Sequence, residues 1–404
     1  MKGKRLLLTV FCMLAVMLLT SCWNSRELNE MAIVTGMGID KAPDKDEYRV
    51  TFQIVNPSST ATSMGASTGQ PTITVYSATD RTLFGALRKT SKKAARQLFF
   101  AHTQLVVIGE DMARSGIDDI FDVFERSHEL RLNATVLVSR GDDANSIMKI
   151  LLPIESLPAM GLVKKVRNTA AIWGENRDIT IFELINGITG EGEVVISGIR
   201  VIGDKEEGKK KANLEQTEVK AIPAISGLGV FKKGKLVTWL EGSEAKGVLW
   251  VQNKIDQTTV NIDTEGSEAS VAVDINYSKT AINVELREGV PVFHVHIQEE
   301  GKISETRGFM DLSNGDEIAK LEEQLAKQTK EAAIRSIQAA QRLESDIFDF
   351  GNELKRLRPK EWEAVKEDWS SLFAQGKLDV RVEAHIRGTG MRLKPYLQNK
   401  DESN

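Results

Sequence analysis

The chain has 404 residues, of which 41% are hydrophobic, 27% charged and 6% aromatic, and its formal net charge is −4. This composition is ordinary for globular proteins and excludes collagen-like, purely coiled-coil and wholly disordered chains. The net negative charge argues against a nucleic-acid-binding protein, because neutralising phosphates requires a basic surface. At about 100–200 residues per domain, the length indicates two or three domains.

The N-terminus has the features of an export signal. Lys2, Lys4 and Arg5 precede an apolar stretch over residues 6–19. A helix of that length spans about 21 Å, less than the hydrocarbon core of about 30 Å, which favours a signal peptide over a permanent span. The next residues, Leu-Thr-Ser-Cys ending at Cys22, resemble a bacterial lipobox, in which the cysteine is lipidated and the chain is cleaved before it. We predict a signal peptide over residues 1–21 and lipid attachment at Cys22. An ordinary signal peptide is the alternative.

Cysteine usage supports a chain stabilised without disulfides. The two cysteines of the chain, Cys12 and Cys22, both lie in this N-terminal region. Cleavage would remove Cys12 and lipid would occupy Cys22, so the mature chain would retain no thiol pair and would depend on buried cores. Cleavage would also remove three cations and no acid. Because anionic headgroups repel an acidic body, we expect lipid rather than charge to provide the attachment.

The N-terminal half mixes short strands with helices. In residues 48–54, apolar Tyr48, Val50, Phe52 and Ile54 alternate with polar residues, which is typical of a half-buried strand. A Ser/Thr-rich loop is expected over residues 57–71. Further strands are expected at residues 31–39, 72–77, 102–108, 135–139 and 194–202, and helices at 80–97, 111–127, 144–152, 158–173 and 179–188. We predict an N-terminal α+β domain over residues 22–148, followed by a smaller helical and strand subdomain over 149–202 that can be continuous with it.

Residues 203–220 differ in composition from both flanks. The segment is highly charged and almost free of large apolar side chains. Two interpretations remain open: a domain boundary, and a long polar hairpin connection within one domain. We place a charged linker or loop at 203–220 and start a C-terminal α+β domain at residues 221–404.

The C-terminal domain is predicted to combine an antiparallel sheet with a long helix. Strands are expected at residues 224–231, 235–240, 270–277, 281–287, 292–298 and 378–387, and shorter helices at 243–251 and 360–373. From Asp316 an apolar stripe at helical spacing predicts an amphipathic helix of about 30 residues, capped by Ser313 or Asn314. It either crosses its own sheet or reaches a neighbouring chain. The fold class is therefore α+β and multi-domain, with mixed or antiparallel sheets and packed helices.

Signatures of catalysis are absent from the sequence. It contains neither a GxxxxGK[ST] phosphate-binding loop nor a GxSxG nucleophile elbow. His294 and His296 point to the same face of one expected strand and could supply two metal ligands, but no third ligand is evident, and a solvated sheet face is the better interpretation. We predict no catalytic residue, no cofactor and no metal, and hence no enzyme.

The mature N-terminus and three further segments resemble the Ger(x)C family, the lipoprotein subunits of spore germinant receptors. The similar segments are CWNSRELNEMAIVTGMGID (Cys22–Asp40), the stretch Thr82–Ile117, the stretch Asp346–Trp369 and VEAHIRGTG (Val382–Gly390). The resemblance implies an α+β fold and lipidation (palmitate) at Cys22. It also implies a position on the outer face of the spore inner membrane. It implies two integral-membrane partners, one with large soluble domains and one transporter-like. The function it implies is a non-enzymatic role in nutrient-triggered germination.

Two other protein classes share parts of this pattern. A solute-binding lipoprotein of a transport system has the same signal, but it would need two lobes with parallel sheets, whereas the C-terminal half here is predicted to be antiparallel. An extracytoplasmic hydrolase would need a convergent acid/base pair, which the sequence does not indicate.

Overall fold

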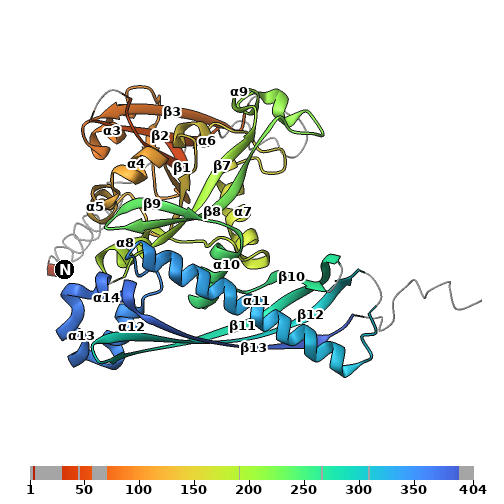
Figure 1. The fold of residues 1–404 in the computed structure, drawn as a ribbon. Coiled ribbons are helices and arrows are strands. Elements are labelled where there is room, and N and C mark those ends of the chain that lie inside the picture. The colour runs from red at the N-terminus through yellow and green to blue at the C-terminus, as the bar shows by residue number, and fades with distance from the viewer. Residues whose placement is uncertain are drawn as a thin grey trace, which may run out of the picture.

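The computed structural model describes residues 3–4, 30–43, 46–56, 71–190, 192–264, 267–307 and 310–390. Cys22, together with the predicted signal peptide except residues 3 and 4, lies outside these ranges. Within them, no helix is both long and apolar enough to cross a membrane. The described strands form two sheets, one above the other in Figure 1.

The first sheet is mixed, with a parallel centre flanked by antiparallel strands. Nine of the described strands form it in the order β3-β2-β1-β5-β6-β7-β8-β9, with the short β4 beside β1 (Figure 1). Strands β1, β5, β6 and β7 run parallel, while β2, β3, β8 and β9 are joined antiparallel at the two sides. The bounds are β1 Met31–Lys41, β2 Tyr48–Val55, β3 Ile73–Asp80, β4 Gln97–Phe99, β5 Leu105–Ile108, β6 Thr135–Ser139, β7 Val195–Gly203, β8 Ala221–Lys232 and β9 Lys235–Leu240.

Helices cover both faces of this sheet, which explains why its central strands are continuous apolar runs. Val106 and Val136 pack on one face with side chains of α3, α5 and α8, and Leu105 and Leu137 pack on the other with α6 and α7. The helices of this half are α3 Leu83–Thr90, α4 Glu110–Ser115, α5 Asp118–Arg126, α6 Ala144–Ile147, α7 Pro158–Ile172 and α8 Ile181–Thr189.

The charged segment 203–220 connects two neighbouring strands of this sheet. It carries α9 (Lys205–Gly208) and the 3₁₀ turn η2 (Lys211–Leu214), and β7 pairs antiparallel with β8 from Gly203↔Ala221 onward. Residues 221–240 therefore complete the first sheet, so the segment is a polar, largely exposed connection between two of its strands. The division of the chain into domains at 203–220 stays a prediction.

The C-terminal half is a four-stranded sheet with one long helix lying across it (Figure 1). Strands β10, β11 and β12 pair antiparallel, and β13 runs parallel to β12. The elements of this half, among the described residues, are α10 Gly242–Val251, β10 Thr258–Thr264, β11 Ser267–Arg287, β12 Val290–Thr306, α11 Gly315–Arg342, α12 Phe350–Leu357, α13 Pro359–Val365, η3 Lys366–Asp368, α14 Trp369–Gln375 and β13 Lys377–Gly388. The predicted α+β class with mixed and antiparallel sheets is confirmed.

The long helix α11 buries the predicted apolar stripe against its own domain. Leu321, Leu325, Ile337 and Ala340 are buried with the inward-facing side chains of the sheet. Asn314 caps the helix by accepting a hydrogen bond from the Asp316 N–H at 3.0 Å. Gly247 of α10 allows a close helix crossing, because a Cβ there would lie 2.2 Å from the Ala332 carbonyl oxygen. Of the two placements left open for this helix, packing across its own sheet is the one observed.

Candidate functional site

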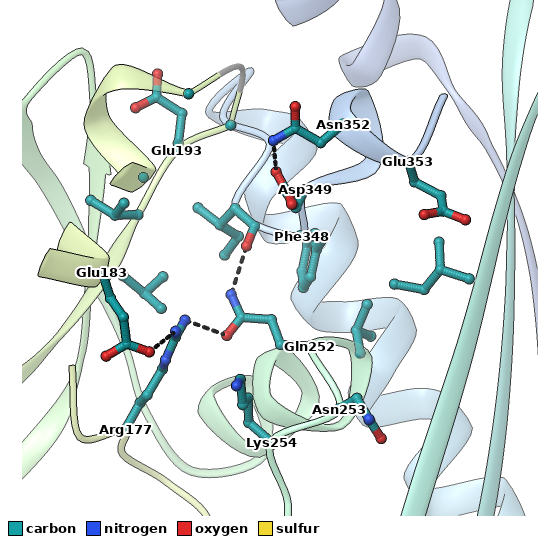
Figure 2. A pocket seen from close by; sticks show the side chains of 18 of the residues that line it. Arg177, Glu183, Glu193, Gln252, Asn253, Lys254, Phe348, Asp349, Asn352 and Glu353 are labelled. Atoms are coloured by element: carbon teal, nitrogen blue, oxygen red, sulfur yellow. Dashed lines mark hydrogen bonds and ion pairs between the residues drawn. The ribbon is translucent and has the colours of Figure 1, made fainter. Parts of the chain in front are cut away.

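A groove of about 870 Å³ lies where the two halves of the chain meet (Figure 2). One wall comes from α8 and the residues that flank it, and the other from the end of α10, the middle of β11 and the turn after α11. Residues more than one hundred positions apart in the sequence therefore face one another across it. This placement makes the groove the strongest candidate for a site whose shape depends on how the halves are held together.

A chain of hydrogen bonds crosses the groove from one half to the other. Arg177 Nη2 lies 3.3 Å from Glu183 Oε1, and Arg177 Nη1 donates to Gln252 Oε1 at 3.5 Å. Gln252 Nε2 then donates to the Ile347 carbonyl at 2.6 Å. Figure 2 shows these contacts in sequence from α8 through α10 to the turn after α11. The groove is thus bridged by polar side chains at one point.

Acidic and basic side chains line the groove, and local contacts shift the pKa of two of its acids. Burial alone would raise the pKa of Glu183, but the Thr180 N–H and hydroxyl and the Arg177 charge outweigh burial and lower it. For Glu193, burial prevails and raises the pKa, although the Lys233 N–H donates to both carboxylate oxygens at 3.0 Å. The exposed Lys254 adds a cation at the opposite wall.

The turn at the base of the groove is organised by one buried carboxylate, Asp346. Its two oxygens accept hydrogen bonds from the N–H groups of Phe348 (3.2 Å), Phe350 (3.2 Å) and Gly351 (2.8 Å) and from the Trp369 indole (2.9 Å). Burial raises the pKa of Asp346, and these donors only partly offset it. Its backbone carbonyl also accepts from the Glu193 N–H of the other half at 3.0 Å. One residue therefore fixes both the turn and a contact between the halves.

The polar groups that line the groove are amides, carboxylates and cations, together with the hydroxyl of Thr280. That hydroxyl donates to the Trp250 carbonyl at 2.6 Å. The mixture of amide, carboxylate and cationic groups is chemically suited to hold a polar chain segment or a small polar ligand.

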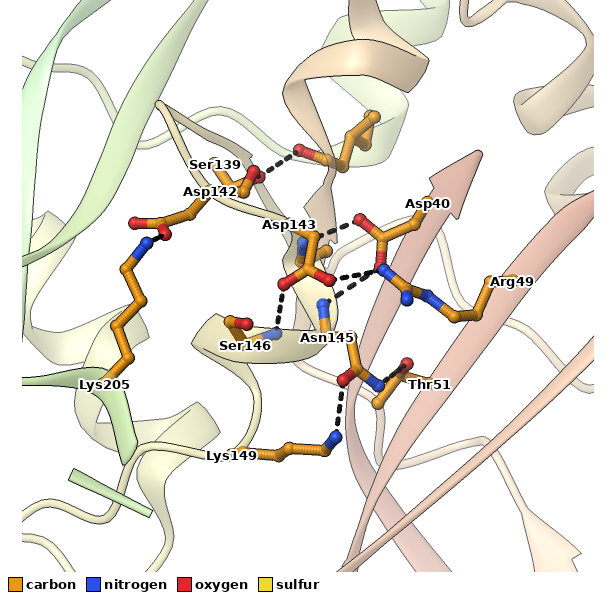
Figure 3. A network of polar contacts seen from close by, with 12 residues as sticks. Asp40, Arg49, Thr51, Ser139, Asp142, Asp143, Asn145, Ser146, Lys149 and Lys205 are labelled. Carbon is orange, nitrogen blue, oxygen red and sulfur yellow. Dashed lines mark hydrogen bonds and ion pairs between the residues drawn. The ribbon is translucent and has the colours of Figure 1, made fainter. Parts of the chain in front are cut away.

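A second polar cluster lies at the carboxyl ends of the parallel strands of the first sheet (Figure 3). Asp40, buried at the end of β1, accepts hydrogen bonds from the N–H groups of Ala144 (2.7 Å) and Asn145 (3.0 Å). Arg49 Nη2 lies 3.1 Å from Asp40 and 2.5 Å from Asp143. Burial raises the pKa of Asp40, and Arg49 partly offsets this. The cluster ties β1 and β2 to the start of α6.

This cluster borders a cavity of about 1160 Å³, but its acids are mostly engaged within the protein. Asp142 pairs with Lys205, and Asp143 caps α6 by accepting from the Ser146 N–H at 2.8 Å. Asp143 therefore serves as the N-cap of α6, whereas Asp142 is engaged by a lysine of the connection between β7 and β8. No group of three His, Cys, Asp or Glu residues suited to a metal ion occurs among the described residues.

The paired histidines lie on the outward face of the C-terminal sheet and contact carboxylates. His294 Nδ1 is 2.9 Å from Asp379 and its Nε2 is 3.2 Å from Glu285, while His296 Nε2 is 3.1 Å from Glu383. Both rings are partly exposed, with side-chain exposures of 28% and 42%. The two histidines thus share one face, as the spacing predicts, within a partly solvated network of charges.

A single carboxyl group, Glu299 of β12, is buried beneath α11. Thr329 Oγ1 donates to its Oε1 at 2.8 Å, whereas its Oε2 has no hydrogen-bond partner among the described residues. Burial raises the pKa of Glu299 to about 7, and the nearby Thr329 and Trp250 side chains offset this only in part. Because the unfolded chain has the ordinary pKa of about 4.3, the folded protein binds an extra proton between these two values.

Stability is therefore expected to fall as pH rises from about 4.3 through 7, and the full loss is present above 7. The loss amounts to about 4 kcal/mol, since the two pKa values differ by about 2.7 and one pKa unit corresponds to about 1.4 kcal/mol. Glu299→Gln should remove most of this dependence and make the protein more stable than wild type at pH 8. Urea unfolding at pH 5 and pH 8, followed by tryptophan fluorescence, measures it. Glu300→Gln, on the outward face beside it, is the control and should keep the wild-type dependence.

The sequence pointed to the pair His294 and His296, and to Cys22, which lies outside the described residues. It did not point to the groove or to Asp346. The only signal in the sequence was the cluster Asp346-Ile-Phe-Asp-Phe-Gly351, which combines acids, buried aromatics and a glycine. In the structure Gly351 is required there, because a Cβ would lie 2.8 Å from the Trp369 indole nitrogen.

Comparison with known proteins covers nearly the whole chain. Residues 24–201 match the family described as spore germination protein N-terminal domain, and residues 226–390 match the family described as spore germination B3/GerAC like, C-terminal. Spore germination protein KC of Bacillus subtilis (strain 168) is 34% identical over 406 residues, covering 99% of this chain and 100% of that protein. Putative spore germination protein YfkR of the same organism is 28% identical, covering 89% and 92%.

A solved structure has the same fold. The crystal structure of the GerBC protein superposes with a TM-score of 0.56 at 18% identity, covering 87% of this chain and 97% of that one. At this identity the likeness concerns the fold, and both halves of the chain described above are included in it.

Proposed function

The chain belongs to the family of spore germination proteins that these comparisons describe, and from this premise we propose that it is a lipid-anchored, non-enzymatic subunit of a nutrient germinant receptor. The observation that carries the proposal is the full-length similarity to spore germination protein KC, at 34% identity over 99% of the chain. Relatives named spore germination protein B3 and A3 support the same role.

The anchor is proposed to be lipid on Cys22, on the outer face of the spore inner membrane. The Leu-Thr-Ser-Cys sequence ending at Cys22 supports this, because it provides the small residues and the cysteine that lipoprotein processing needs. Anchoring confines the protein to two dimensions and so raises its effective concentration near membrane partners. Two such partners are proposed, a polytopic transporter-like subunit and a membrane subunit with large soluble domains.

A role in assembly rather than catalysis is supported by the chemistry of the candidate site. The groove between the halves offers amides, carboxylates and cations, which suit the binding of a polar chain segment. Such a surface can position a partner segment or respond to its docking, since its shape depends on the contacts between the halves.

Affinity capture of the native protein from detergent-solubilised spore membranes tests the proposal. Co-purification of a transporter-like polytopic protein with a second large membrane subunit is the expected result. Recovery of an ATP-driven permease would instead support a solute-binding lipoprotein. Recovery of the protein with no membrane partner would contradict the receptor role.

A further inference from the structure

The stretch between Asp80 and Glu110 departs from the acidic balance of the chain. Its 29 residues contain six Lys or Arg residues and no Asp or Glu, although 57 of the 404 residues are acidic. The stretch includes α3, β4 and the loop that joins them. Three of its cations, Lys92, Lys93 and Arg96, are exposed in or near that loop, and we call them the basic edge.

Neighbouring acids do not neutralise the basic edge. Lys93 Nζ donates to the Ser77 carbonyl at 2.6 Å, and none of the three forms an ion pair with a carboxylate of the described residues. The charged segment 203–220 is different. Four of its five lysines, at 205, 209, 210 and 211, are each paired with an acid, the exception being Lys220. Both stretches are rich in basic residues, but among the described residues most of the lysines of 203–220 are compensated and the three cations of the basic edge are not.

Strand pairing places the basic edge beside the point where the anchor would join the body. Strand β4 runs parallel to the start of β1, with Gln97 opposite Met31, so the same register places Arg96 next to Glu30, the exposed acid that leads into β1 and that forms no ion pair with it within 4.0 Å. Lys92 and Lys93 are at most four residues from Arg96, or about 14 Å along the chain. The nine residues from Cys22 to Met31 span about 30 Å when fully extended. A bilayer holding the lipid on Cys22 is therefore within reach of all three cations.

We propose that the basic edge contacts the anionic headgroups of the membrane in which Cys22 is anchored. The inference rests on the lipid attachment proposed above. Net charge is a poor guide here, because salt screens charges beyond about 10 Å and only the groups nearest the bilayer interact with it. The contact adds a second membrane attachment at a defined side of the body. It therefore fixes which face turns toward the bilayer and which faces remain free for partners.

Binding of the unacylated chain to vesicles isolates this contact from the lipid. The chain from residue 22 onward, carrying Cys22→Ser, is sedimented at low ionic strength with vesicles of phosphatidylcholine alone or mixed 7:3 with phosphatidylglycerol. Binding to the anionic vesicles only is expected. Each exposed Lys or Arg near such a surface strengthens binding about fivefold, and Arg96 has the exposed acid Glu30 beside it, so the triple variant Lys92→Gln, Lys93→Gln, Arg96→Gln should bind at least about 25-fold more weakly.

A matched control variant shows whether the position of the three cations matters, and not only the loss of three positive charges. Lys279→Gln, Lys327→Gln and Lys330→Gln remove the same charge from exposed positions on β11 and α11 of the C-terminal half. This control is expected to bind within twofold of the wild type. Equal loss in both triple variants, unchanged binding of the basic-edge variant, or wild-type binding that ignores anionic lipid would each overturn the proposal.

The result of the vesicle experiment does not depend on whether Cys22 carries lipid. All these chains lack lipid, so failure to bind vesicles leaves the role of Cys22 intact. Conversely, absence of palmitate from Cys22 in spores would contradict the anchor without changing the vesicle result. Since the six substituted side chains are exposed, unchanged circular dichroism and melting are expected for both triple variants.

Discussion

Cys22→Ala is expected to abolish lipid incorporation and nutrient-triggered germination while leaving the folded body intact. The substitution removes the thiol that would carry the diacylglyceryl group, and each buried methylene of such chains contributes about 0.8 kcal/mol to membrane attachment. The chain should either be released from the membrane or persist as an unprocessed precursor. Labelling of sporulating cells with radioactive palmitate, followed by membrane fractionation and a germination assay, measures all three effects.

The other cysteine provides a matched control for this experiment. Cys12 lies within the apolar part of the predicted signal, ten residues before Cys22. Cys12→Ala should therefore be labelled, processed and retained as in the wild type. If the Cys22→Ala protein stays in the membrane fraction and supports germination at the wild-type rate, lipid on Cys22 is not the anchor.

Asp346→Ala is expected to lower the free energy of unfolding by about 4 kcal/mol, a large loss for a single substitution. The change leaves three backbone N–H groups and the Trp369 indole without their acceptor in a buried turn. An unsatisfied buried donor costs about 1–3 kcal/mol, and partial relaxation of the turn reduces the sum. Urea unfolding monitored by tryptophan fluorescence reports the change, because Trp369 itself loses a partner.

Two comparisons show whether the acceptor oxygens are responsible. Asp346→Asn keeps one acceptor oxygen in place and should lose less stability than the alanine variant. Asp368→Ala removes an exposed acid that has no hydrogen bond or ion pair to a described residue, and its stability should change by less than about 0.5 kcal/mol. Equal stability of the Asp346→Ala protein and the wild type would show that the turn does not depend on this carboxylate.

The long helix and the central strands could be predicted because their patterns are set by burial on one face or on both. The apolar stripe from Ile318 to Ala340 predicted α11, and the run Leu105–Ile108 predicted β5. The residues at which helices and strands begin and end were harder to predict where contacts with distant parts of the chain determine them. The helix expected over residues 111–127 is divided into α4 and α5 at Gly116, whose φ is +132°. The strands expected at 270–277 and 281–287 are one strand, β11, because pairing with β12 continues across the polar residues between them.

Composition indicates exposure but not strand pairing, which is why the sequence left open how the strands on either side of residues 203–220 are arranged. Residues 203–220 are solvent-facing, yet the strands on either side of them are neighbours in one sheet. The groove could not be predicted for a related reason. Arg177, Gln252 and Ile347 come from three distant parts of the chain, and nothing in their local sequence indicates that they meet. Lipid attachment at Cys22 stays a prediction, and it could be made from sequence because a processing signal is read as a linear sequence.

The position of β1 determines how a pull from the membrane would be carried by the body. If lipid on Cys22 anchors the chain as proposed, the load enters the described body at β1, an interior strand held by β2 on one side and by β4 and β5 on the other. A force along this strand would load its flanking hydrogen bonds together in shear, whereas peeling an edge strand breaks such bonds one after another. An anchor joined at β1 would therefore distribute mechanical load over the first sheet, and the body should stay folded under a pull from the membrane.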